Sequence, residues 1–196
     1  MTDRSFVRFG GLAGILLAAT SWLAVVEYYT LAKSGSDVVG LEGFQFLYAL
    51  IGFWALIGIV AVRERVRSVG ESWSFFATLV GAIAAVGTIA SGVYAAATLR
   101  ATGQVAAVDP VSPLGLMTFG LTGVWFLVTA LLMWRTDLPK LLTLLGFVAV
   151  ADLFVGFVAS VVPVAPLATL AGVVAGAVGG PLFWLWLGIL LRRDPA

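Results

Sequence analysis

The chain has 196 residues, of which 61% are hydrophobic and only 11% are charged, and its net charge is +1. Soluble domains are roughly 45–50% apolar and about 25% charged, so this chain lacks the polar surface that an aqueous globule needs. Cysteine and histidine are absent, which excludes disulfides, thiolate nucleophiles, imidazole metal ligands and Ser-His-Asp catalysis. The small net charge gives no sign of nucleic-acid binding.

Long apolar runs predict an all-α fold, a polytopic bundle of about six transmembrane helices that forms one domain over residues 1–196. About twenty apolar helical residues cross a hydrocarbon core of about 30 Å. The first run is too long for the apolar region of a signal peptide and is interpreted as a retained anchor. In chain order, the predicted spans are 9–31, 43–62, 73–99, 114–134, 141–162 and 167–191.

Charged residues between the runs predict the orientation, because Lys and Arg near helix ends resist translocation. The loops of one set carry only Lys33 and Arg100, whereas the other set carries nine basic residues: Arg4, Arg8, Arg63, Arg65, Arg67, Arg135, Lys140, Arg192 and Arg193. We therefore expect a cell-membrane protein with both termini in the cytoplasm. The two lysines against nine arginines and the absence of asparagine indicate a GC-rich prokaryotic genome. The stretch Arg63–Arg67 either provides this orientation signal or contacts anionic lipid head groups.

Two carboxylates within the predicted spans form the candidate polar site. Asp152 lies near the middle of the fifth span, where a charge costs about 2.5–3.5 kcal/mol and is rarely without a role. Glu27 lies near the outer end of the first span, beside Tyr28 and Tyr29. Each is either a proton- or cation-linked site or a structural hydrogen-bonding group. A cavity shared by both carboxylates would favour a transport path.

Small residues at four-residue spacing predict close contacts between helices. The sixth span carries Gly172, Gly176 and Gly180, and the third carries Gly81 and Gly92. Such faces pack inside one bundle or form a homo-oligomer. Pro181 is expected to kink the sixth span near Ala177.

Tryptophans recur within the predicted spans and have two interpretations. They are either packing residues or the walls of an apolar ligand site for a lipid, a quinone or a carotenoid. No cofactor is predicted. The tryptophans concerned are Trp22, Trp54, Trp125, Trp184 and Trp186.

Three short stretches carry a resemblance to known proteins. They are Arg8–Gly14, the turn Arg135–Leu142 with the following Leu145-Gly146, and Phe183–Arg193. In them the chain resembles small bacterial six-helix membrane proteins that are grouped as a domain of unknown function. The resemblance implies a six-helix integral membrane fold and brings no functional residues.

Two functions fit the sequence. The first is a non-enzymatic structural or accessory subunit of a membrane assembly, or a lipid-binding scaffold, whose partners are membrane lipids and other membrane subunits. The second is a small proton- or cation-coupled transporter or channel. Weak similarity between Gly11–Ile15 and Gly120–Val124 is compatible with the inverted repeats of many transporters.

Substitution of Asp152 separates these two functions. If the carboxyl protonates during transport, Asp152→Asn is expected to abolish pH-dependent flux in liposomes, because the amide cannot take up a proton. Wild-type flux in this variant would remove Asp152 from the mechanism.

Overall fold

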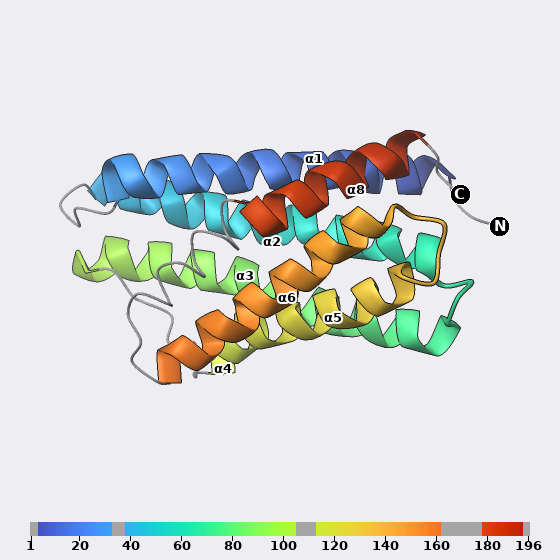
Figure 1. The fold of residues 1–196 in the computed structure, drawn as a ribbon. Coiled ribbons are helices and arrows are strands. Elements are labelled where there is room, and N and C mark those ends of the chain that lie inside the picture. Colours follow the sequence, from blue (N-terminus) through green and yellow to red (C-terminus); the bar gives the residue numbers. More distant parts are fainter. Residues whose placement is uncertain (1–3, 33–37, 105–112, 162–177, 194–196) are drawn as a thin grey trace.

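The computed structural model describes residues 4–32, 38–104, 113–161 and 178–193, and in these residues the fold is all-helical (Figure 1). Six helical rods make up this part of the chain, and π-helical turns, labelled η, continue two of them. In chain order the elements are α1 (Arg4–Glu27), η1 (Tyr28–Ala32), α2 (Val38–Val66), α3 (Glu71–Thr102), α4 (Pro113–Gly115), η2 (Leu116–Gly120), α5 (Leu121–Met133), α6 (Lys140–Val161) and α8 (Gly180–Arg193).

Four of these rods are long and apolar enough to cross a membrane: Arg4–Leu31, Gly40–Val66, Glu71–Thr102 and Pro113–Met133. They correspond to the first four predicted spans. The fifth prediction, 141–162, overlaps α6. Of the sixth, 167–191, the part from 167 to 177 lies outside the described residues.

The second and third spans are longer than the apolar runs that predicted them. The helix α2 extends beyond the predicted apolar span 43–62 at both ends and continues through Arg63 to Val66. Charged side chains do not break a helix that has left the hydrocarbon. At a rise of about 1.5 Å per residue, the 32 residues of α3 extend for roughly 48 Å, well beyond a core of about 30 Å.

The helices pack mainly as a chain of neighbours. α1 contacts α2 and α8, α2 contacts α3, α3 contacts α5, and α5 contacts α6. Figure 1 shows both chain termini at the same end of the bundle as the α2–α3 and α5–α6 turns. We call this the terminal end, and the opposite end the far end. The segments that carry most of the basic residues therefore lie together at the terminal end.

The outward faces of the helices are apolar. On α3 the exposed side chains include Trp73, Phe76, Leu79, Ile83 and Val86. A contiguous apolar face of this kind is rare on soluble monomers and marks contact with lipid or protein. The exposed faces therefore support a membrane location for these helices.

The backbones of α1 and α8 approach each other closely. A methyl group added at Gly188 would lie 2.5 Å from the Gly11 carbonyl oxygen, and one added at Gly11 would lie 2.6 Å from the Gly188 carbonyl oxygen. Only glycine permits backbones to come this close. The pair fixes where α1 and α8 cross.

Ion pairs connect the helix ends at the terminal end. Arg65 Nη2 lies 3.5 Å from Asp137 Oδ2, which joins α2 to the turn between α5 and α6. Arg63 pairs with Glu71 at the start of α3, and Arg67 Nη2 lies 3.2 Å from Glu64 Oε2. All three arginines of the stretch Arg63–Arg67 thus have carboxylate partners within the protein.

The substitution Gly188→Ala is expected to lower stability by about 1–3 kcal/mol, because the new methyl group forces α1 and α8 apart. Thermal unfolding in detergent micelles, followed by circular dichroism, measures the effect. Gly123→Ala is the matched control, since the added methyl group would meet its nearest neighbour, Leu153 Cβ, at an ordinary 3.7 Å. Equal melting temperatures for the two variants would contradict this account of the α1–α8 contact.

Candidate ligand cavity

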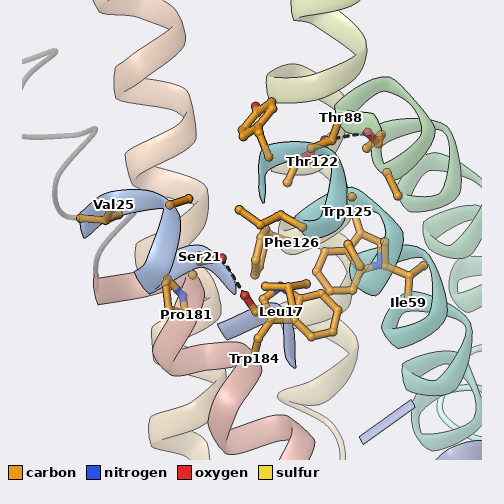
Figure 2. Close-up of a pocket in the computed structure, with 18 of the residues that line it drawn as sticks. Leu17, Ser21, Val25, Ile59, Thr88, Thr122, Trp125, Phe126, Pro181 and Trp184 are labelled. Atoms are coloured by element: carbon orange, nitrogen blue, oxygen red, sulfur yellow. Dashed lines mark hydrogen bonds between the residues drawn. The ribbon is translucent and has the colours of Figure 1, made fainter. Parts of the chain in front are cut away.

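A cavity of about 520 Å³ lies within the bundle (Figure 2). Described residues of five helices line it: α1 with η1, α2, α3, α5 and α8. Its volume falls within the roughly 300–1,000 Å³ that is typical of small-molecule sites. Its walls consist mostly of aliphatic and aromatic side chains.

Two stacked tryptophans form the wall nearer the terminal end. The rings of Trp125 on α5 and Trp184 on α8 are parallel within 1°, with their centroids 5.1 Å apart. Phe126 also lines the cavity, and its ring meets Trp125 edge-on at 4.8 Å between centroids. These rings give the cavity a broad, rigid apolar surface.

Glycines on neighbouring helices provide the space for these rings. A methyl group added at Gly81 of α3 would lie 2.5 Å from Trp125 Cδ1, and one added at Gly58 of α2 would lie 2.6 Å from Trp184 Cζ3. The positions of both indoles therefore depend on the missing side chains opposite them. We call Gly58 and Gly81 the indole-seating glycines.

The polar side chains among the described lining residues are all uncharged. They are the hydroxyls of Ser21, Tyr28, Tyr29, Tyr48, Thr88 and Thr122. Ser21 Oγ donates to the Leu17 carbonyl oxygen at 2.9 Å, Thr88 Oγ1 donates to that of Ala84 at 3.0 Å, and Thr122 Oγ1 donates to that of Thr118. Each of these three side chains thus satisfies its own donor within its helix.

The tyrosines gather toward the far end. Tyr28 and Tyr29 come from the π-helical turn η1, and Tyr48 comes from the adjacent part of α2. Phe44 joins them, since its ring lies 5.4 Å from that of Tyr28 and 6.3 Å from that of Tyr48 between centroids. π-helical turns are rare and often occur at functional sites. Here one of them brings two aromatic residues to the cavity.

A polar contact beside the cavity ties the second π-helical turn to α3. Thr118 Oγ1 in η2 lies 3.0 Å from Ser91 Oγ, and both groups are buried. A methyl group added at Gly87 would lie 2.9 Å from Met117 Cβ. η2 is therefore held close against the middle of α3.

Of the two predicted carboxylates, the structure describes the side chain of Glu27 but not that of Asp152. Glu27 is the last residue of α1, and its carboxylate packs against Gly43 of α2, where an added methyl group would overlap Glu27 Oε1. Glu27 is not among the described residues that line the cavity. Asp152 belongs to the backbone of α6, and its side chain lies outside the part of the structure that is described.

The predicted packing glycines fall in different places. Gly81 faces Trp125, and a methyl group added at Gly92 would lie 2.6 Å from the Gln45 carbonyl oxygen of α2. Gly180 and Pro181 line the cavity. Gly172, Gly176 and Ala177 lie outside the described residues, and the π-helical pair Val178 and Gly179 directly precedes Gly180.

Several cavity residues have no signal in the sequence. Ser21, Tyr48, Thr88 and Thr122 each look like an ordinary residue of an apolar helix, and only their placement opposite one another makes a site. For the stacked pair Trp125 and Trp184, the sequence allows two interpretations, packing residues or the walls of a ligand site. Across residues 4–32, 38–104, 113–161 and 178–193, no group of three metal-binding side chains comes together.

Comparison with protein-family models, with curated proteins and with solved structures finds no match to this chain.

The substitution Gly58→Ala is expected to displace the Trp184 ring and to disrupt its stacking on Trp125. Parallel indoles couple electronically, so near-ultraviolet circular dichroism should lose at least half of the signal of this pair. Gly123→Ala again provides the control, because no aromatic ring is among the atoms near its added methyl group. An unchanged spectrum for Gly58→Ala would show that this glycine does not seat the indole.

Proposed function

We propose that this protein is a non-enzymatic, lipid-binding membrane scaffold that crosses the cell membrane six times with both termini in the cytoplasm. The observation that carries the proposal is the apolar cavity of about 520 Å³ that described residues of five helices line. A cavity with aromatic walls and a few fixed hydroxyls suits a lipophilic ligand. Such a ligand reaches the protein directly from the surrounding bilayer.

The position of the basic segments in the bundle supports the proposed orientation. The two termini and both turns rich in arginine or lysine lie at one end of the bundle (Figure 1). The basic residues of these segments would all face the cytoplasm, in keeping with the positive-inside rule.

The transport alternative has less support. A cavity shared by Glu27 and Asp152 would favour it, and Glu27 packs against Gly43 instead of lining the described cavity. The cavity walls carry hydroxyls but no described charged side chain. A charge-coupled path would need such a group.

Filling the cavity tests the proposed function. Ala24 of α1 lines the cavity, and Ala24→Phe should reduce the amount of native lipid or other lipophile that co-purifies with the protein by more than half. Extraction into polymer nanodiscs followed by mass spectrometry measures this amount. Ala19→Phe is the control on the same helix, because Ala19 is exposed on the outer face and should leave the bound amount unchanged.

Two results would count against the proposal. One is a purified wild-type protein that carries no lipophile in a fixed ratio to the chain. The other is equal loss in the Ala24→Phe and Ala19→Phe variants, which would point to general lipid contact instead of a cavity.

A further inference from the structure

The absence of charge on the cavity walls restricts the ligand. The described lining residues include six hydroxyl-bearing side chains and no acid or base. An ion that enters an apolar cavity loses its hydration, and without an opposite charge this loss is not offset. The occupant that fits these walls is therefore uncharged.

The hydrogen bonds of the lining restrict the ligand further. Ser21, Thr88 and Thr122 use their donors on carbonyl oxygens of their own helices. Tyr48 lines the cavity and is partly buried, and its hydroxyl is not one of the fully buried polar atoms without a partner in the described residues, so it remains accessible. An accessible hydroxyl in an otherwise apolar lining can donate to a ligand, so a ligand with an acceptor atom near Tyr48 fits this site better than a pure hydrocarbon.

The two ends of the cavity differ in chemistry. Tyr48 and Ile59 both line it. They are eleven positions apart along α2, which corresponds to roughly 16 Å at the helical rise. The Ile59 level also holds the stacked pair Trp125 and Trp184, where the lining is apolar. An elongated molecule would meet a donor at one end and aromatic surface at the other.

On the basis of the function proposed above, we propose that the cavity binds an uncharged lipophile that carries a carbonyl group at one end. The carbonyl oxygen accepts a hydrogen bond from the Tyr48 hydroxyl, and the apolar stem extends along α2 to the stacked tryptophans. Lipid-soluble quinones and neutral glycerol esters share this chemistry.

Binding measurements on the full chain in phosphatidylcholine nanodiscs test this inference with three probes. Decylubiquinone supplies a quinone carbonyl, dioctanoylglycerol supplies an ester carbonyl, and ionised dodecanoate supplies an alkyl chain with a charge. We expect saturable binding of at least one neutral probe and binding of dodecanoate at least tenfold weaker. The stronger of the two neutral probes identifies the source of the carbonyl.

Two tyrosine variants locate the polar end of the ligand. Tyr48→Phe keeps the ring that packs near Phe44 and removes only the hydroxyl, so it should raise the Kd of the neutral probe about fivefold, the usual effect of one lost hydrogen bond. Tyr94→Phe is the matched control, because Tyr94 is 58% exposed on α3 and does not line the cavity. Its Kd should equal that of the wild type.

The outcomes separate this inference from the function on which it rests. Equal Kd values for wild type and Tyr48→Phe, or dodecanoate binding as tight as that of the neutral probes, would overturn the ligand class while binding itself stands. Loss of neutral-probe binding in Ala24→Phe but not in Ala19→Phe supports the cavity as the site. If no probe binds to the wild-type protein, both the ligand class and the lipid-binding function fail.

Discussion

Close backbone packing is the constraint on which the rest of the bundle depends. In an apolar surrounding each helix satisfies its own peptide groups, and burial of apolar surface no longer favours one helix face over another, so helices associate through close contact. Gly11 and Gly188 allow α1 and α8 to meet backbone to backbone, and Gly92 does the same between α3 and α2. These contacts set the helix positions, and the helix positions set the space that remains between them.

The cavity is a product of the same packing. At one level the indole rings of Trp125 and Trp184 fill the space that Gly81 and Gly58 leave open. At the next level the lining residues are small, among them Gly52, Ala55, Ala84 and Ala85, and space remains. The helices therefore pack closely at the level of the tryptophans. At the next level the facing side chains are too small to fill the space, and the cavity remains.

The sequence predicts the helices well and the cavity poorly, for physical reasons. Long apolar runs have few structural outcomes other than helices, so the first four spans were recognisable. Their ends were not, because the helix from Val38 continues through Arg63, whose charge is balanced by Glu71. The cavity depends on which residues of different helices share a level, and a single apolar helix with Ser21 or Tyr48 looks like any other. The sequence shows that Glu27 is a charged residue in an apolar span. Its contact with Gly43 depends on how two helices pack, which the sequence does not show.

The ion pairs at the terminal end have a consequence for how the protein is made. While the chain is being inserted, the positive charge of Arg63, Arg65 and Arg67 holds this turn in the cytoplasm in the proposed orientation. Acidic residues contribute little to that decision, so Glu64, Glu71 and Asp137 do not cancel it. After the helices assemble, the same carboxylates bind the arginines and join α2 to α3 and to the α5–α6 turn. The three arginines thus orient the chain during membrane insertion and afterwards form ion pairs that stabilise the folded bundle.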